Sequence, residues 1–411
     1  MKILMITPYV TILGKPEFEK NKTGFGYMVM DIARAVRKFE SVEVLATDSR
    51  GEAFEQDGVL FLKRSLSLYF SRLLHCLSPG SILRLRRKYP MQKRTFLRLI
   101  YYWLMTGYLH SLLKKGEYDI VHIHGCGFAT EQWMSVCKLC GQKFVVTLHG
   151  LNSFSDSVSL EPAGKQYERD FLERVVKGEF SITVISSGMK RLIEKTYNNS
   201  KESKNISVVC NSFDFNSHIT NAGSIKFKYN IPQEGRVLLS VGNITKNKNQ
   251  IQLVRAFGLL PDLMQQNTYV LFCGRLDSSC GVEKELEKQK YASHLIMCGG
   301  VPKTELPSYY VDADCVILLS YAEGFGLSLI EGMHFGKPCV TFEDLASFKD
   351  IYDPSCVIGI HGREDKDVMG AIENCLTMVW NNEEIVKKSK RFEAGTMAKN
   401  YMSVYSNIKE S

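Results

Sequence analysis

The chain has 411 residues, of which 45% are hydrophobic and 23% are charged, and these proportions exclude a disordered or fibrous protein. No apolar run reaches the roughly 18 residues of a membrane span, and the first apolar run ends at Pro8, too early for a signal peptide. The twelve cysteines show no disulfide or zinc spacing, so we expect free thiols, no metal site and a cytoplasmic protein.

Short runs of Val, Ile and Leu alternate with helical stretches along the chain, which predicts parallel sheets with crossover helices. In the first half these runs cover residues 3–6, 42–46, 120–124, 144–149, 182–186 and a start at 208. In the second half they cover residues 237–241, 269–273, 295–298, 315–319 and 339–342. A polar, asparagine-rich stretch places a boundary near residue 225. We therefore predict two Rossmann-like domains, residues 1–225 and 226–392, that face each other across a cleft.

Near the N-terminus, Gly24 and Gly26 precede a predicted helix, where glycine lets the backbone approach a phosphate closely. His149 ends a predicted strand, at the sheet edge where parallel sheets bind ligands. A histidine that only hydrogen-bonds at a strand end is the alternative. His122 and His124 share one face of the preceding strand without a third metal ligand, so we interpret them as structural.

Residues 63–115 hold twelve lysines and arginines and no aspartate or glutamate. Subtracting these twelve from the net charge of +8 leaves −4 for the rest of the chain. The basic residues interleave with Leu, Phe, Tyr and Trp, which predicts helices with an apolar stripe and a cationic face. We expect this face to bind an anionic membrane surface and no nucleic acid, because no nucleic-acid-binding motif accompanies it. A solvated helix pair without a partner is the alternative.

A polar loop follows the predicted strand at residues 237–241, in the sequence LLSVGNITKNKNQIQLVRAF. It runs from Gly242 to Lys248 and leads into an amphipathic helix. Lys248 can contact phosphate as a compact point charge. A lysine near a helix start that binds no anion is unfavourable, because the helix dipole is positive at that end. A solvated lysine is the alternative.

A glycine turn follows the predicted strand at residues 315–319, in the sequence EGFGLSLIEGMHFGKPCV. It leads into a predicted helix over residues 327–335, which Gly336 is placed to cap. Exposed backbone N–H groups at the helix start, from Phe325 to Leu327, form an expected anion site, and Gly324 and Gly326 let a phosphate approach the backbone closely. Glu323 before the helix and Glu331 one turn inside it suit sugar hydroxyls. The alternative is that both glutamates only complement the helix dipole.

Together these two segments resemble the nucleotide-sugar glycosyltransferases of family 4, or group 1, which have the GT-B fold. Glu323 and Glu331 match that family's E-x7-E arrangement, and Gly242 to Lys248 match its donor loop. The resemblance continues in order through DIVHIHG, VVTLHG, VVCNSFD and GGVPKTELPSYYVDADCVILLS. It ends with RFEAGTMAKNYMSVYSNI, which resembles the last helix that returns to the N-terminal domain, here residues 393–411.

The resemblance implies a retaining glycosyltransferase that uses a UDP- or GDP-sugar and needs no metal or other cofactor. Glu331 would hold the ribose, Lys248 would neutralise the β-phosphate, and Glu323 with residues 324–327 would hold the sugar and pyrophosphate. His149 would lie near the acceptor and the reacting sugar. The leaving phosphate would take the proton from the acceptor hydroxyl in a front-face mechanism. Further donor-binding residues would be Gly24, Gly26, Gly242, Asn243, Arg275 and Val301.

Two departures from the family change these expectations. The family usually has arginine where this chain has Asn243, which weakens the phosphate clamp, and Arg275 is a candidate to compensate. After the next strand the chain reads TFEDLASFKD, where the family often has Gly-Gly and Glu, so the sugar pocket is expected to differ.

The cationic stretch predicts a lipid-linked saccharide acceptor in surface-polysaccharide biosynthesis, with the protein peripheral on the inner face of a membrane. The alternatives are a soluble sugar acceptor and a non-catalytic subunit that binds nucleotide or a partner.

Overall fold

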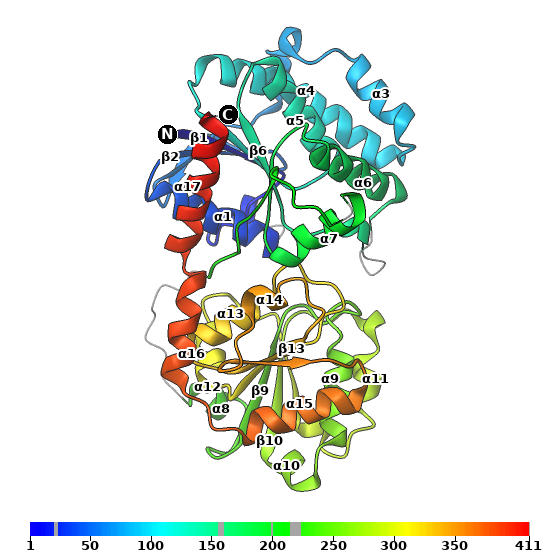
Figure 1. Ribbon diagram of the computed structural model, residues 1–411, viewed down its shortest axis with the longest axis vertical. Helices are drawn as coiled ribbons and strands as arrows, with labels where there is room; N and C mark the ends of the chain where they lie inside the picture. Colours follow the sequence, from blue (N-terminus) through cyan, green and yellow to red (C-terminus); the bar gives the residue numbers. More distant parts are fainter. Residues whose placement is uncertain (20–23, 155–159, 199, 214–222, 411) are drawn as a thin grey trace. The chain divides into compact units, whose positions relative to one another are not determined.

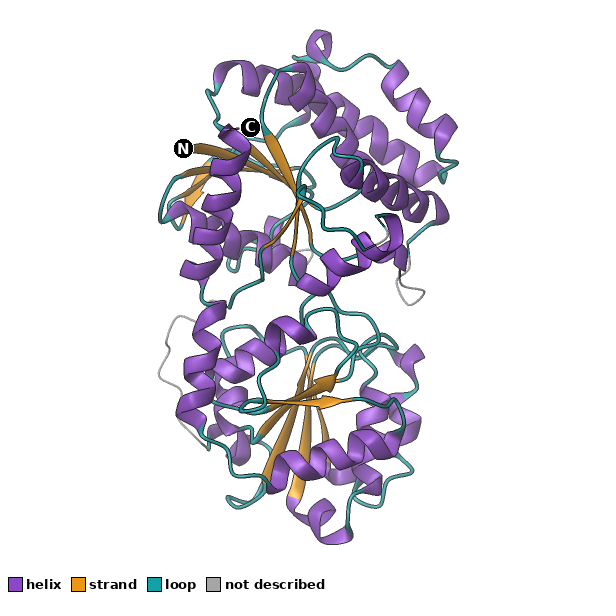
Figure 2. Ribbon diagram, in the orientation of Figure 1, coloured by secondary structure: helices purple, strands orange, loops and turns teal. Residues whose placement is uncertain are grey.

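The computed structural model describes residues 1–19, 24–154, 160–198, 200–213 and 223–410. The chain forms two compact units (Figure 1). One comprises Met1–Asn211 with Ala394–Ser411, and the other comprises Ser212–Glu393. The division thus falls after Asn211, whereas the sequence places the boundary near residue 225. Helices cover both faces of the sheet in each unit (Figure 2).

The first unit is built on a sheet with strand order β3-β4-β2-β1-β5-β6-β7-β8. Its described strand pairs are parallel, apart from the antiparallel pair of β3 and β4. The strands are β1 (Lys2–Thr7), β2 (Ser41–Ala46), β3 (Phe54–Gln56), β4 (Val59–Phe61), β5 (Ile120–His124), β6 (Phe144–Leu148), β7 (Ile182–Val184) and β8 (Ile206–Val208). The helices are α1 (Gly24–Arg37), α2 (Leu66–Phe70), α3 (Gly80–Lys88), α4 (Lys93–Lys115), α5 (Phe128–Leu139), α6 (Pro162–Val176), α7 (Ser187–Tyr197) and α17 (Ala394–Glu410).

The second unit has a sheet with strand order β11-β10-β9-β12-β13-β14, whose described strand pairs are parallel. The strands are β9 (Arg236–Val241), β10 (Thr268–Cys273), β11 (Leu295–Gly299), β12 (Cys315–Leu318), β13 (Cys339–Phe342) and β14 (Val357–Ile360). The helices are α8 (Ser224–Lys228), α9 (Gln250–Leu259), α10 (Asp262–Asn267), α11 (Val282–Leu286), α12 (Leu306–Asp312), α13 (Leu327–His334), α14 (Phe348–Ile351), α15 (Asp365–Thr377) and α16 (Asn382–Ser389).

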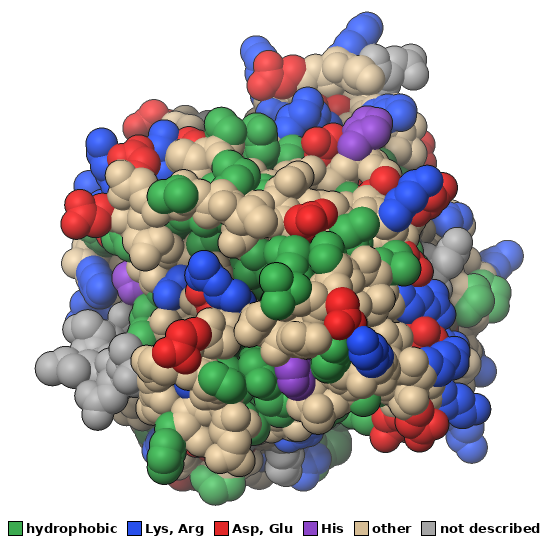
Figure 3. Space-filling view, turned by 90° about the horizontal axis from the view of Figure 1, so that it is seen from below, with side chains coloured by type: hydrophobic (Ala, Val, Ile, Leu, Met, Phe, Trp, Pro, Cys, Tyr) green, Lys and Arg blue, Asp and Glu red, His purple; other side chains and the backbone are tan. Residues whose placement is uncertain are grey.

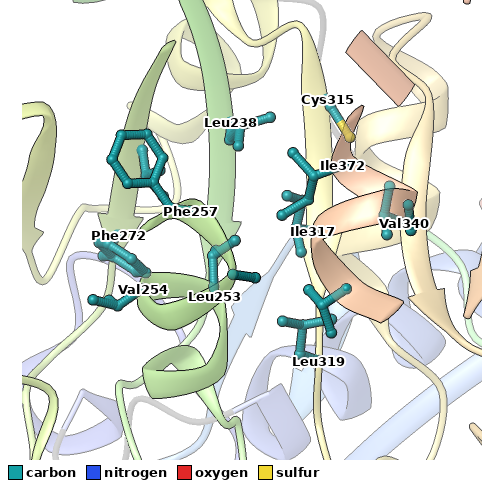
Figure 4. Packing of buried hydrophobic residues seen from close by; sticks show 14 of the residues in the cluster. Leu238, Leu253, Val254, Phe257, Phe272, Cys315, Ile317, Leu319, Val340 and Ile372 are labelled. Atoms are coloured by element: carbon teal, nitrogen blue, oxygen red, sulfur yellow. The ribbon is translucent and has the colours of Figure 1, made fainter. Parts of the chain in front are cut away.

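The core of the second unit fixes the strands whose ends carry the candidate site. Phe257 of α9 and Ile372 of α15 pack with Leu238, Phe272 and Ile317 of the central strands (Figure 4). Burying each such side chain contributes about 1.5–3 kcal/mol. Since the strands are parallel, their carboxyl ends lie along one edge of the sheet, and the loops that follow them are held close together.

The last helix, α17, belongs to the first unit, as the sequence predicts for a returning C-terminal helix. It packs against α1 and β6 of that unit. The predicted class of two parallel-sheet α/β domains is therefore confirmed. In the described part of the chain, no helix combines the length and apolar character that crossing a bilayer requires.

Candidate functional site

In the second unit, Asn247 joins the loop after β9 to the loop after β12. Its side-chain amide donates to the carbonyl oxygen of Ala322 at 2.8 Å, and its Oδ1 accepts the Ala322 N–H at 3.1 Å. The backbone oxygen of Asn247 also accepts the N–H of Tyr321 at 2.8 Å. These bonds fix the position of Lys248, the next residue, relative to Glu323.

Lys248 and Glu323 form an ion pair between Nζ and Oε2. Their side chains are only 26% and 22% exposed, so the pair is more strongly coupled than a fully solvated one. Gly242 lies beneath the lysine, since a Cβ there would be 3.6 Å from Lys248 Cε, and its φ of 137° favours glycine. The ammonium group has three N–H donors, so it can keep Glu323 and also contact a bound anion.

Helix α13 begins directly after the glycine turn, as predicted. Gly326 adopts a left-handed φ of 87°, and a Cβ there would come within 2.9 Å of Leu318 Cδ2. The first-turn N–H groups of an α-helix lack partners inside the helix, so they are available to an anion. At the other end, Gly336 N–H bonds to Met333 O at 3.0 Å and Lys337 N–H to Gly332 O at 2.9 Å, which is the glycine cap that the sequence predicts.

Glu331, the second predicted carboxylate, lies in α13 and is held from α12. The Tyr310 hydroxyl donates to Glu331 Oε2 at 2.5 Å. Burial and the neighbouring Glu331 raise the pKa of Tyr310, so this hydroxyl stays protonated and remains a donor. The ring of Phe335 stacks on Tyr310 with centroids 5.6 Å apart.

The segment after β13, which departs from the family pattern, supports the glycine turn. Ser347 is fully buried, and its hydroxyl donates to the backbone oxygen of Phe325. Leu345 packs beside Gly326, where a Cβ would lie 3.6 Å from Leu345 Cδ2. Phe325 itself is buried and packs edge-on against Phe392. The Phe325 side chain therefore anchors the turn, and only its backbone is a candidate to contact a ligand.

The three other predicted donor residues of this unit follow neighbouring strands. Asn243 Oδ1 accepts the N–H of Arg275, the second residue after β10, at 3.3 Å. The Arg275 side chain runs beside Gly300, where a Cβ would lie 3.4 Å from Arg275 Cγ. Gly300 precedes Val301, which is partly exposed. The structure thus brings these three residues together at the ends of β9, β10 and β11.

In the first unit, His149 directly follows β6 and is partly buried. Its Nε2 lies 3.2 Å from Nδ1 of His124, at the end of β5. The ring of Phe25 meets His149 edge-on, with centroids 4.8 Å apart. Burial lowers the pKa of His149 to about 4, so the ring is neutral near pH 7.

The predicted glycine loop of the first unit needs a correction. Helix α1 begins at Gly24, so Gly24 and Gly26 lie inside its first turn and not before it. Gly26 is required by close packing, because a Cβ there would be 2.3 Å from Thr11 Oγ1, and its carbonyl accepts the Thr11 N–H at 3.1 Å. A Cβ at Gly24 meets no described atom within 4 Å. Residues 21–23 of the predicted loop lie outside the described residues.

His122 is fully buried and uses both ring nitrogens inside the protein. Its Nδ1 lies 2.7 Å from the Tyr405 hydroxyl, and its Nε2 lies 2.6 Å from Thr147 Oγ1. Burial lowers the pKa of His122 to about 3. This environment agrees with a structural role. The described residues contain no group of three or more His, Cys, Asp and Glu that could hold a metal ion.

The basic stretch at residues 63–115 forms α2, α3 and α4 of the first unit. Arg64 is an exception to the predicted cationic face, because it is buried and donates to Ser49 Oγ at 2.7 Å. Seven exposed basic residues of this stretch make no ion pair with a described residue: Arg84, Arg86, Arg87, Lys93, Arg94, Lys114 and Lys115. The same stretch carries exposed large apolar residues: Phe70, Leu73, Leu74, Leu83 and Leu97.

Three residues that support the site were not foreseen from the sequence. Asn247 and Tyr310 hold Lys248 and Glu331, and Ser347 holds the glycine turn. Asn247 could have been found from its position, since it adjoins Lys248 in a polar loop that follows a buried strand. Tyr310 and Ser347 carry no comparable signal, because neither adjoins a residue that the sequence identifies as a candidate.

Comparisons with known proteins agree with this geometry. The family described as "Glycosyltransferase Family 4" matches residues 23–217, and "Glycosyl transferases group 1" matches residues 222–362. An N-acetyl-alpha-D-glucosaminyl L-malate synthase of Bacillus anthracis is 23% identical over 65% of this chain and 70% of its own length. The O-antigen chain mannosyltransferase RfbU of Salmonella typhimurium is 25% identical over 56% of this chain and 60% of its own.

Among solved structures, Anabaena Alr3699/HepE in complex with UDP matches with a TM-score of 0.66 and 15% identity, covering 99% of this chain and 100% of that one. Since the two family matches together span most of the sequence, the chain belongs to the group 1, family 4 glycosyltransferases.

Proposed function

We propose that the protein is a retaining glycosyltransferase that moves a sugar from a UDP- or GDP-sugar to a hydroxyl of a lipid-linked saccharide in surface-polysaccharide biosynthesis. The observation that carries this proposal is the Lys248–Glu323 ion pair beside the start of α13, with Glu331 one turn further on. A cation, a helix N-terminus and two carboxylates are what a diphosphate flanked by two polyols requires.

The donor roles follow from the chemistry of these groups. Lys248 and the first N–H groups of α13 neutralise the diphosphate as the bond to the sugar breaks. Glu331, held by Tyr310, accepts hydrogen bonds from the ribose hydroxyls, and Glu323 accepts them from the transferred sugar. Arg275, whose N–H bonds to Asn243, is the candidate to supply the positive charge that Asn243 lacks.

The proposed reaction keeps the anomeric configuration without a carboxylate nucleophile. The leaving phosphate oxygen takes the proton of the attacking hydroxyl on the same face of the sugar, and the cations of the donor site stabilise the negative charge that develops. No metal is needed for this step in the proposal. The UDP complex of the structurally similar HepE protein supports a donor with a uridine nucleotide.

A donor screen tests the proposal most directly. Purified protein is incubated with a panel of UDP- and GDP-sugars and a lipid-linked saccharide, and free nucleoside diphosphate is measured. Release that depends on the acceptor is the expected result. Glu331→Ala should weaken nucleotide binding while circular dichroism stays unchanged, and unchanged nucleotide affinity would contradict the ribose role. Release without dependence on lipid would favour a soluble sugar acceptor.

The acceptor part of the proposal depends on the surface of α3 and the start of α4. Exposed basic residues lie there with the exposed Leu83 and Leu97, a composition that adsorbs to anionic headgroups at about 1 kcal/mol per basic residue. Figure 3 gives a contrasting view from below, where acidic and basic side chains are interspersed. The protein would then act peripherally on the cytoplasmic face of a membrane.

Co-sedimentation with vesicles tests this surface. Wild-type protein should bind vesicles rich in anionic lipid and be released by salt, whereas neutral vesicles should not retain it. Replacing Arg84, Arg87 and Arg94 by glutamine should reduce binding. A matched control replaces Lys284, Lys288 and Lys290 of the second unit, which lie outside the basic stretch. Equal loss in both triple variants would remove the surface from the proposal.

A second candidate function is a non-catalytic subunit that binds nucleotide without turnover. Asn243 favours it, because the residue replaces an arginine that is usual in the family. Nucleotide binding without nucleoside diphosphate release across the whole donor panel would support this alternative.

A further inference from the structure

We propose that His124 is a positioning residue that keeps the proton of His149 on Nδ1, so that His149 offers an N–H donor to a substrate hydroxyl. The structural part concerns the first unit alone, and only the identity of the ligand rests on the proposed function. His124 is the last residue of β5, which is the neighbour of β6 in the sheet, and His149 directly follows β6.

The contact between the two rings is fixed by the sheet. Strands β5 and β6 are parallel neighbours, with His124 opposite Thr147, two residues before His149. His124 Nδ1 and His149 Nε2 are 3.2 Å apart. His124 is fully buried and also packs against His122, with ring centroids 4.0 Å apart. Because His122 is bonded to Tyr405 and Thr147, the stack has little freedom to rotate.

Both rings of the pair are neutral. Burial lowers the pKa of His149 to about 4, and burial together with the nearby His122 and His149 lowers that of His124 well below its usual value. A neutral imidazole carries one proton on one of its two nitrogens. The hydrogen bond between the rings therefore contains a single proton, and one ring must donate while the other accepts.

The surroundings of His124 decide which ring donates. Its Nε2 is buried and has no hydrogen-bond partner among the described residues. A proton on Nε2 would be a buried N–H without an acceptor, which proteins avoid more strongly than an unused lone pair. The proton therefore lies on Nδ1 of His124, which donates to His149 Nε2.

The consequence for His149 follows directly. Its Nε2 lone pair is engaged by His124, so its own proton must lie on Nδ1, for which no described residue is an acceptor. His149 then acts as a hydrogen-bond donor to an oxygen, such as a sugar hydroxyl, and not as a base that removes a proton. This role is compatible with a reaction in which the leaving phosphate takes the proton.

Nitrogen NMR of ¹⁵N-histidine-labelled full-length protein tests the proposal without any substrate. Signals of the pair are assigned from His124→Phe and His149→Phe variants. In wild-type protein near pH 7 we expect both rings to be protonated on Nδ1. In His124→Phe we expect His149 to shift towards the Nε2-protonated form that water favours. Wild-type His149 protonated on Nε2, or an unchanged His149 in His124→Phe, would overturn the inference.

Activity gives a second measurement. His124→Phe should lower kcat at least about tenfold with a small change in KM for the donor. His124→Asn restores an amide N–H near the Nδ1 position and should recover much of that loss. His361→Phe is the control, because that histidine is 95% exposed and bonds only to Glu343 in the described structure.

The two outcomes separate the proposals. Loss of kcat in His124→Phe without rescue by His124→Asn would contradict the positioning role. An expected NMR result in a protein that transfers no sugar would contradict the proposed function and leave the proton assignment intact.

Discussion

The two candidate sites lie at equivalent sheet edges, but one is built from charged side chains and the other from neutral ones. In the second unit, Lys248 and Glu323 stay partly exposed and form an ion pair. In the first unit, His122 and His124 are fully buried, and they and the partly buried His149 are neutral. Partial exposure limits the free-energy cost of keeping Lys248 and Glu323 charged, whereas burial favours the neutral form of the histidines. The same kind of edge therefore supplies charge in one unit and neutral hydrogen bonds in the other.

The strongest test of the charged site is Lys248→Ala. Losing a charged contact to phosphate should lower turnover at least about tenfold, equivalent to 1.4 kcal/mol or more. Lys246→Ala is the matched control, since Lys246 lies in the same loop but is exposed and makes no ion pair with a described residue. Steady-state rates of nucleoside diphosphate release are measured for both. Equal effects of the two substitutions would remove the distinction between Lys248 and an ordinary surface lysine.

The hydrogen bonds that join the loop after β9 to the loop after β12 can be tested with Asn247→Leu. This change removes both side-chain bonds to Ala322 and leaves a partly buried N–H and C=O without partners, so the free energy of unfolding should fall by about 2 kcal/mol. Urea denaturation measures the change, and nucleotide affinity should fall as well because Lys248 loses its fixed position. Asn267→Leu is a control from an exposed amide bonded only within its own helix. Normal nucleotide affinity in Asn247→Leu would show that the hydrogen bonds between Asn247 and Ala322 do not position Lys248.

The neutral site predicts a pH dependence of stability. The pKa of His122 is about 3 and that of His149 about 4 in the folded protein, below the usual value near 6.5. The unfolded chain therefore binds more protons between these values, and stability falls as pH drops from about 6.5 towards 4. Each such histidine contributes up to about 1.4 kcal/mol per pH unit.

The measurement is urea denaturation at several pH values for wild-type protein and His122→Phe. The variant should lose stability less steeply on acidification, whereas His361→Phe should not reduce the slope. Identical slopes for wild type and His122→Phe would mean that His122 is not held neutral.

The smallest expected effect comes from Tyr405→Phe, which removes one bond to His122. The free energy of unfolding should fall by about 1 kcal/mol. In a His122→Phe background the same substitution should cost less, because the partner is already absent. Additive effects in this double-mutant cycle would show that the two side chains are not coupled.

Much of the fold could be predicted because buried parallel strands are continuous apolar runs. Each of the eleven runs chosen from the sequence overlaps a strand between β1 and β13. The strands β3 and β4 were missed because they are short, although the Asp57-Gly58 turn between them is a recognised hairpin signal. Strand β14 was missed because Val357–Ile360 is short and contains Gly359.

The site was predictable where a residue follows a strand and unpredictable where its partner comes from elsewhere. The sequence identifies Lys248 and Glu323 as candidates, but their ion pair depends on β9 and β12 being neighbours. The burial of Arg64 could not be predicted either, because a count of basic residues does not show which side chain is buried. The roles of the site residues in binding and catalysis stay predictions.

The return of α17 to the first unit has a consequence for biogenesis. Tyr405 bonds to His122, 283 residues earlier in the sequence, so the first unit cannot complete its interior until the ribosome has made the whole of the second. The second unit is continuous and can fold as soon as residue 393 has emerged. During translation, the middle of the chain should therefore reach its native state before the beginning does.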